Sequence, residues 1–284
     1  MTQAKSRLYG RRIKGDIGPL NIDPASRLPG RIFGPAVSLD GADQYYDEAS
    51  DIQHFTFGSR MVVDERVFHY ASAGGTLNPG YGAKQVLPQH VAFAAIAGCT
   101  QGEYTVVVTT TVNDGVLGDG HIAANELSGG FIVIFTPGNN AINRRIVANS
   151  VVGPAPLTYA MTVTVDRPWP VDVANTEHAE MMASPYRLVQ TGNFPVASVM
   201  GMPQQIATVN QFIWLQTWGP TWVVPGGAWI GNDNRRAVFL GNGSIQEYTW
   251  GDALVQQAQL AGYILCNGQA GAAGAPFLQL MIAP

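Results

Sequence analysis

Charged residues are scarce in this chain, and lysine is the scarcest of them. Only 13% of the 284 residues are Asp, Glu, Lys or Arg, about half the roughly 25% that is usual in soluble domains. Lysine occurs three times, at Lys5, Lys14 and Lys84. Coiled coils and long helical bundles need runs rich in Ala, Glu, Lys and Leu, so this composition excludes them. Because 46% of the residues are hydrophobic, most of the chain should fold rather than stay disordered.

Cysteine and long apolar runs are equally limited. The two cysteines, Cys99 and Cys266, lie far apart and fit no metal-binding spacing, so we expect two buried small hydrophobic side chains. No apolar run reaches the roughly 18 residues of a membrane-spanning helix, so we expect no membrane partner. Residues 1–14 lack the apolar region of a signal peptide, which predicts synthesis in a cytoplasm.

Motifs that carry catalysis are missing as well. The sequence contains no HExxH, GxSxG, P-loop or GxGxxG pattern. The acidic pairs Asp47–Glu48 and Asp64–Glu65 are adjacent, so in a strand their carboxylates would point to opposite faces and could not act together. We therefore predict no enzymatic activity, no catalytic residues and no cofactor.

One cluster contains potential ligands for a hard cation. The run NDGVLGDGHIAANE holds Asp114, Asp119, His121 and Glu126. Its spacing matches neither an EF-hand nor a tandem nonapeptide repeat, and Asp and Gly are common in turns for conformational reasons. We favour a turn over a metal site.

Short β-type runs between turns are the most frequent pattern in the sequence. We expect strands at 104–111, 131–135, 145–148 and 161–165, and then at 186–191, 196–200, 212–218, 221–224, 237–240, 244–248, 261–266 and 276–282. The run MTVTV (161–165) alternates and should expose one face, whereas FIVIF (131–135) does not and should be buried on both. The best helix candidate is VDVANTEHAEMMA (171–183), which we place at the connection between two domains.

These patterns predict an all-β chain of two β-rich domains, each a barrel or sandwich, with an extended N-terminal arm and at most one or two short helices. We expect the arm at 1–50, a first β-rich domain with a C-terminal linker or helix at 51–183, and a second, barrel-like domain at 184–284.

The expected arm is basic, and the rest of the chain is acidic. Residues 1–31 carry a net charge of +5, whereas the whole chain carries −4. Such an arm is suited to docking on an acidic surface or a polyanion; the alternative is a solvated, partly disordered terminus. The candidate docking residues are Arg7, Arg11, Arg12, Lys14, Arg27 and Arg31.

Tryptophan is concentrated near the C-terminus. The candidates for a self-association or ligand-binding face are Trp214, Trp218, Trp222, Trp229 and Trp250. Trp214 and Trp218 are four residues apart, so in a regular strand they share a face. Such aromatics could bind sugars or bases, but we favour the core or an intersubunit interface. Without a Lys/Arg cluster beside them, we expect no direct nucleic-acid binding.

Several segments resemble a known class of viral proteins. They are DERVFHYASAGGTLNPGYGAKQ (64–85), SGGFIVIFTPGNNAINRRIVANS (128–150), SPYRLVQTG (184–192), FIWLQTWGPTWVV (212–224), QLAGYILCNG (259–268) and the terminal FLQLMIAP. Together they resemble capsid-associated structural proteins of tailed bacteriophages, and the second half is similar to small β-barrel capsid decoration (cement) proteins. The resemblance implies a non-enzymatic virion component on the capsid surface, with the major capsid protein as partner and a homo-oligomer, often a trimer, as its state.

Two other functions remain open from the sequence. A tail-fibre or head-fibre module that binds a receptor or glycan would use exposed tryptophans, with Trp229 or Trp250 in contact with solvent. The major capsid protein itself would need a long spine helix, and the sequence contains no uninterrupted amphipathic stretch of about 20 residues.

Overall fold

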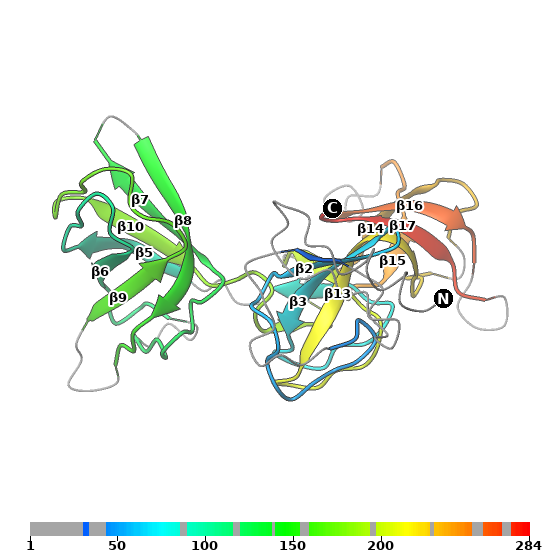
Figure 1. Cartoon of the computed structure of the whole chain (residues 1–284). Coiled ribbons are helices and arrows are strands. Elements are labelled where there is room, and N and C mark those ends of the chain that lie inside the picture. The colour runs from blue at the N-terminus through cyan, green and yellow to red at the C-terminus, as the bar shows by residue number, and fades with distance from the viewer. Residues whose placement is uncertain are drawn as a thin grey trace, which may run out of the picture. The chain divides into compact units, whose positions relative to one another are not determined.

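The computed structural model describes residues 31–33, 44–85, 90–115, 120–137, 140–153, 159–193, 197–227, 230–251, 258–268 and 274–284. Within these ranges every regular element is a β-strand, which confirms the all-β prediction. No helix among the described residues has the length and hydropathy needed to cross a bilayer. The chain forms two compact units: Leu87–Pro185 is one, and Met1–Val86 together with Tyr186–Pro284 is the other (Figure 1).

The unit at 87–185 is a closed six-stranded barrel. Its strands are β5 (His90–Ile96), β6 (Thr105–Thr109), β7 (Phe131–Thr136), β8 (Asn140–Asn149), β9 (Ala160–Val165) and β10 (His178–Met182). They pair in the closed order β10-β5-β6-β9-β8-β7, with every neighbouring pair antiparallel.

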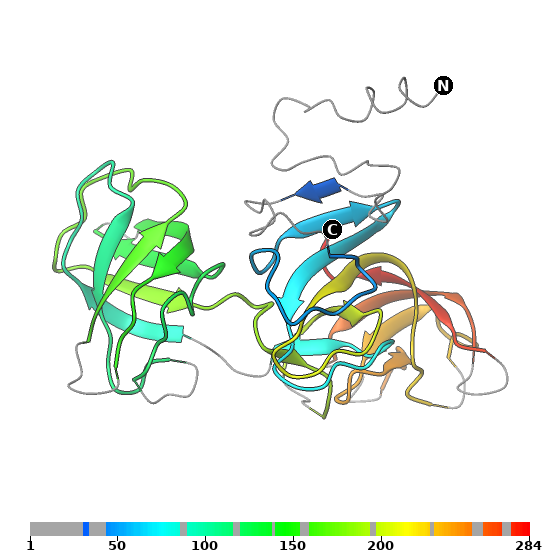
Figure 2. The same cartoon turned by 60° about the horizontal axis from the view of Figure 1, so that its bottom comes forward.

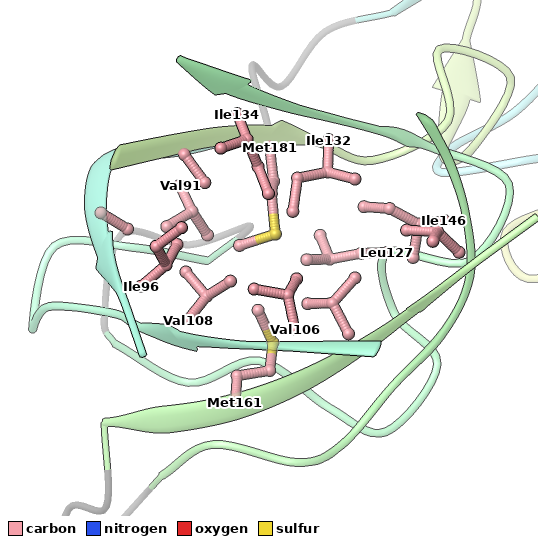
Figure 3. Packing of buried hydrophobic residues seen from close by; sticks show 14 of the residues in the cluster. Val91, Ile96, Val106, Val108, Leu127, Ile132, Ile134, Ile146, Met161 and Met181 are labelled. Carbon is pink, nitrogen blue, oxygen red and sulfur yellow. The ribbon is translucent and has the colours of Figure 1, made fainter. Parts of the chain in front are cut away.

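The barrel interior is filled by branched aliphatic side chains and methionines. Figure 3 shows Val91, Val106, Ile132 and Met181 among the side chains that meet inside the ring of strands. Strand β9 alternates exposed and buried residues, as expected for a strand with one solvent face. This alternation confirms the prediction for MTVTV at 161–165.

The unit formed by the two ends of the chain is built on one branched sheet. Its strands are β1 (Arg31–Phe33), β2 (Arg60–Val63), β3 (Arg66–Ser72), β4 (Ala83–Gln85), β11 (Val189–Gln190), β12 (Val199–Pro203), β13 (Phe212–Trp222), β14 (Arg236–Phe239), β15 (Ile245–Glu247), β16 (Leu260–Cys266) and β17 (Phe277–Met281). The main path is β1-β2-β3-β13-β17-β16-β14-β15, and a branch runs from β13 through β12 and β4 to β11. Figure 2 shows β1, the blue arrow, beside β2 at one edge of this sheet.

The division of the chain into domains differs from the one expected. Strand β3 pairs along β13, with Tyr70 opposite Trp214, so residues near 70 and near 214 belong to one sheet. The expected domain at 51–183 is therefore wrong at its start. The barrel begins at Leu87 and is an insertion into the other unit, which continues from Tyr186. The break expected between 183 and 184 lies close to the observed end of the barrel.

The N-terminal arm also ends earlier than expected. Gln44 is buried, and its side-chain amide donates to the carbonyl of Phe212 at 2.8 Å. Tyr45 and Tyr46 pack against the aromatic cluster around Phe68 and Trp214. Residues 44–50 are therefore part of the folded unit, while residues 1–30 and 34–43 lie outside the described residues.

Two predictions of local structure are wrong. The helix candidate at 171–183 contains strand β10, in which Ala179 and Met181 point inward while Glu180 and Met182 are exposed. This period of two lets β10 close the barrel between β5 and β7, and it outweighs the helix signals. The run FIVIF is strand β7, but its faces are not both buried, because Phe131 is 40% exposed on the outside of the barrel.

Candidate functional site

Apolar side chains are exposed on the outside of the barrel, over β7 and β10. Phe131 pairs across the strands with Met182, and Phe135 pairs with His178. Phe131, Phe135 and Met182 are 40%, 37% and 38% exposed. We call these three residues the barrel face. Two charged residues border this face. The exposed Glu180 on β10 lies opposite Val133, and Arg145 on β8 lies opposite Phe131.

A second apolar surface lies on the other unit, over β13, β17 and β16. Phe277, Gln279 and Met281 alternate along β17 with the fully buried Leu278 and Leu280, so these three side chains share the opposite face. Their register partners are Trp222, Pro220 and Trp218 on β13, and Tyr263 on β16 lies opposite Gln279. We call this surface the sheet face and define it by Trp218, Trp222, Tyr263, Phe277, Gln279 and Met281.

The predicted tryptophan face is divided by a β-bulge. Gln216 lies opposite Phe68, but Trp218 lies opposite Val67, so the register shifts by one residue between them. Neighbouring residues of a strand point to opposite faces, and the bulge therefore places Trp218 on the other face from Trp214. The expectation that Trp214 and Trp218 share a face is wrong.

Trp214 is a core residue. Its indole is fully buried, donates to the carbonyl of Gln44 at 3.1 Å and packs on Phe55 and Tyr70 with centroid distances of 5.1 and 5.0 Å. Trp214 therefore cannot contribute to a ligand or subunit face without opening the core.

The remaining tryptophans are placed differently from one another. Trp218 and Trp222 are half-buried, and the Trp222 indole lies against Gly80, where a Cβ atom would collide with it. Trp250 is 85% exposed, directly before Gly251, which has a positive φ of 93°. Trp229 lies outside the described residues. Among the tryptophans that the structure describes, Trp218 and Trp222 thus come together on one surface.

Five of the six predicted docking cations lie outside the described residues: Arg7, Arg11, Arg12, Lys14 and Arg27. Arg31 begins β1, where its backbone pairs with Val62 of β2. The segment that carries these cations is therefore joined to the folded unit through a strand at the sheet edge.

The acidic residues near 114–126 hold turns together. Asp114 accepts a hydrogen bond from the backbone N–H of Thr111 at 2.5 Å, and Glu126 accepts one from Ala123 at 2.7 Å. These are local carboxylate-to-backbone contacts typical of turns. Asp119 lies outside the described residues, and no group of three potential metal ligands is found within them.

A half-buried histidine was not singled out by the sequence patterns. His69 on β3 stacks on Tyr186, and its Nδ1 lies 3.0 Å from the hydroxyl of Thr217. The Thr217 hydroxyl donates to the carbonyl of Ala283 at 2.6 Å, and Arg60 donates to the carbonyl of Pro284 at 3.1 Å. The cluster therefore fixes the end of the chain against the sheet. Its members are far apart in sequence, so only pairing of β3 with β13 could have revealed it.

Lys84 is the one described lysine, and it is buried. Its ammonium group donates to the carbonyls of Leu240 and Gly241, and burial lowers its pKa. The same loop approaches the β4 backbone, since Gly82 donates to the carbonyl of Gly243 at 2.7 Å. Lys84 therefore stabilises a loop rather than presenting a charge to solvent.

The cysteines also differ from expectation. Cys266, at the end of β16, is exposed, so the prediction of two buried cysteines is wrong for this residue. The pairing of β16 with β17 shifts between Ile264 and Cys266, and Cys266 lies opposite the exposed Phe277, which explains this exposure. Cys99 is partly buried, and its burial raises the thiol pKa to about 11, with Glu103 and Asp172 acting in the same direction. At neutral pH this thiol is protonated and a weak nucleophile.

Comparison with known proteins gives no relative for this chain: no family model, no curated protein and no solved structure matches it.

Proposed function

We propose that this chain is a structural component of a bacteriophage virion, a decoration protein that binds the outside of the capsid and stabilises it by bridging neighbouring subunits. The observation that carries the proposal is the presence of an exposed apolar face on each unit, the barrel face and the sheet face. Contiguous apolar patches of this kind mark protein–protein contacts in soluble proteins. A bridging subunit needs more than one such surface.

In this proposal the major capsid protein is the principal partner, and copies of the chain also associate with one another. The resemblance of the sequence to decoration proteins favours a trimer. The chain acts without catalysis or cofactor, so its contribution is the free energy of the contacts it makes. The low charge of the sequence supports this role, because flat polar and apolar contacts bury uncharged side chains at lower desolvation cost.

The basic segment before β1 is the proposed docking element. Residues 1–30 contain the cations from Lys5 to Arg27, and the residues that follow them in the sequence, Arg31–Phe33, form β1 at the sheet edge. An acidic capsid surface would attract such a segment, and the attraction would weaken as salt rises.

The test is binding to particles that lack the chain. The full chain should bind and resist dissociation at low salt, whereas a chain without residues 1–30 should bind at least tenfold more weakly, because several charge contacts are lost. The deletion stops before β1, so the folded unit should keep its far-ultraviolet circular dichroism. Equal binding of both chains would contradict the docking role, and no binding of either would contradict the function itself.

A second function is favoured by one observation. Trp250 is 85% exposed and its ring faces solvent beside a glycine turn, as a glycan-binding or receptor-binding fibre module requires. In that case Trp250→Ala should abolish attachment to cells or glycans, and sugars should alter the tryptophan fluorescence. Unchanged attachment and unchanged fluorescence would leave the decoration role as the only one supported.

A further inference from the structure

We infer that the sheet face is the contact between two copies of this chain, related by a two-fold axis that passes close to Gln279. This inference deepens the self-association that forms part of the proposed function, and it rests on that part alone. It replaces the trimer favoured by the sequence resemblance with a dimer.

The sequences of β16 and β17 are typical of strands that are covered on both sides. Strand β17 reads FLQLM and β16 reads LAGYILC, so Gln279 is the one polar side chain between them apart from the tyrosine hydroxyl and the thiol. A strand with one solvent-exposed face normally alternates apolar and polar residues. Here the inward Leu278 and Leu280 are fully buried, while the outward Phe277 is 48% exposed. Another surface is needed to cover the outward side.

The size of the exposed surface agrees with a protein contact. Phe277, Tyr263 and Met281 are 48%, 47% and 39% exposed. Together they leave roughly 250 Å² of apolar surface in water, if each side chain offers about 200 Å² when free. The half-buried Trp218 and Trp222 add to this surface. A patch of this size is comparable to the largest apolar patch of a typical monomer, which is often functional, and it could form the apolar centre of an interface that buries about 800 Å² per partner.

The chemistry of the sheet face favours a second copy over other partners. None of its six residues is charged, so the patch itself can meet its own copy without repulsion between like charges. One cation borders it, since the exposed Arg236 on β14 is the register partner of Tyr263. A nucleic acid or a strongly acidic protein would need several Lys or Arg on this face. The barrel face is bordered by charges of both signs, Glu180 and Arg145, and is better suited to a partner of complementary charge.

The order of residues along β17 is suited to a two-fold contact. Phe277 and Met281 lie two residues to either side of Gln279, and each has a tryptophan opposite it on β13. An axis through Gln279 places Phe277 against Met281 of the partner subunit, which brings a thioether onto an aromatic ring twice. The Gln279 amide has both a donor and an acceptor, so it can pair with its own copy across the axis. Two sheets packed face to face in this way lie about 10 Å apart.

The first experiment measures the oligomeric state of the full chain by analytical ultracentrifugation at micromolar to sub-millimolar concentration. We expect a monomer–dimer equilibrium, and we expect the double variant Phe277→Ser, Met281→Ser to raise the dissociation constant on the order of a hundredfold or more. The matched control is Phe131→Ser, which removes a phenylalanine of similar exposure, 40% against 48% for Phe277, from the barrel face. It should dimerise like the unchanged chain.

Other states of association would overturn the inference. A monomer at all concentrations, a closed trimer, or equal loss of association in the double variant and the control would each contradict the two-fold contact. If the full chain is monomeric but dimerises after removal of residues 1–30, the chain's own N-terminal segment covers the sheet face. Loss of particle binding with an intact dimer would count against the proposed function instead.

The second experiment locates the axis. In a background of Cys99→Ser and Cys266→Ser, Gln279→Cys should give a covalent dimer with a bis-maleimide crosslinker that spans about 10 Å, because residues on the axis face their own copies across the gap between the two sheets. Glu180→Cys, exposed on β10, is the matched control and should give no crosslinked dimer. Equal crosslinking at both positions, or none at position 279 in a chain that dimerises, would contradict the placement of the axis.

Discussion

His69 lies flat against Tyr186, with ring centroids 5.0 Å apart and ring planes 7° apart. Burial raises the pKa of the Tyr186 hydroxyl to about 12. The same burial lowers the pKa of His69 from 6.5 to about 4, and the nearby Arg60 charge adds to this shift. In the folded protein the imidazole is therefore neutral at pH 5 to 6, where an exposed histidine becomes protonated.

This shift predicts a loss of stability in acid. Between pH 6.5 and about 4 the unfolded chain binds a proton at His69 that the folded chain does not, so the stabilisation is complete above 6.5 and is lost as the pH falls to about 4. The shift corresponds to about 3 kcal/mol. Urea unfolding at several pH values should show that His69→Gln flattens this dependence relative to the unchanged chain. The same pH dependence in the variant and the unchanged chain would exclude His69 as the cause.

Tyr70 connects the start of the folded unit to its aromatic core. Its hydroxyl donates to the Gln44 side-chain oxygen at 2.6 Å and accepts from the His54 backbone N–H at 3.0 Å. Tyr70→Phe removes the hydroxyl and leaves the Gln44 side-chain oxygen and the His54 backbone N–H without this hydrogen-bond partner inside the protein. We therefore expect a loss of about 1–3 kcal/mol in the free energy of unfolding. Tyr104→Phe is the control, because Tyr104 is 51% exposed and its loss should cost little. Equal stability of the two variants in urea would contradict this role.

Gly262 on β16 should tolerate no side chain. It has a φ of 144°, and a Cβ atom there would overlap the carbonyl oxygen of Gln279 on β17. Gly262→Ala should therefore lower the unfolding free energy by about 3 kcal/mol, through strain and displacement of the neighbouring strand.

Gly227 provides the matched comparison, since no atom lies within 4 Å of a Cβ built there. Gly227→Ala should leave the stability unchanged or raise it by up to about 1 kcal/mol. Thermal unfolding of the two variants compares these values directly. A melting temperature for Gly262→Ala equal to that of Gly227→Ala would show that β16 and β17 are not packed this closely.

The barrel should be removable as a unit. Gln85 at the end of β4 pairs with Val189 of β11, so the chain leaves and re-enters the other unit at neighbouring strands. Replacing residues 87–185 by a short Gly/Ser linker should leave that unit folded, because closing a short loop there costs little entropy. The isolated segment 87–185 should also fold, since it has its own core. Near-ultraviolet circular dichroism and cooperative melting of both products test this, and unfolding of either would contradict it.

The local structure of this chain could largely be predicted from its sequence. Alternation of β-branched and polar residues located β9, and a run of β-branched residues located β6. Between 186 and 284 turn residues separated most strands correctly, but Gly219 and Pro220 lie within β13 and do not divide 212–218 from 221–224. Strand β5, HVAFAAI, was missed, because alanine-rich runs carry weak β-propensity and lack a clear alternation.

The long-range arrangement could not be predicted. Pairing of β3 with β13 joins segments about 140 residues apart, and no local signal indicates that a barrel is inserted between them. The candidate site could be predicted from the sequence only in part. The sequence singled out Trp218 and Trp222, but the bulge that separates them from Trp214 depends on the pairing, as does the grouping of Phe277 and Met281 with them. Register decides which side chains share a face, and register is a tertiary property.

The most direct test of the virion role is the amount of this chain in purified phage particles. Quantitative mass spectrometry of gradient-purified particles should find the chain in a fixed ratio to the major capsid protein, in the many copies that a lattice-bound decoration protein requires. Absence from the particles, with the chain recovered in the soluble fraction of the lysate, would contradict the proposed function. A ratio of only a few copies per particle would contradict decoration of the lattice and favour the fibre module.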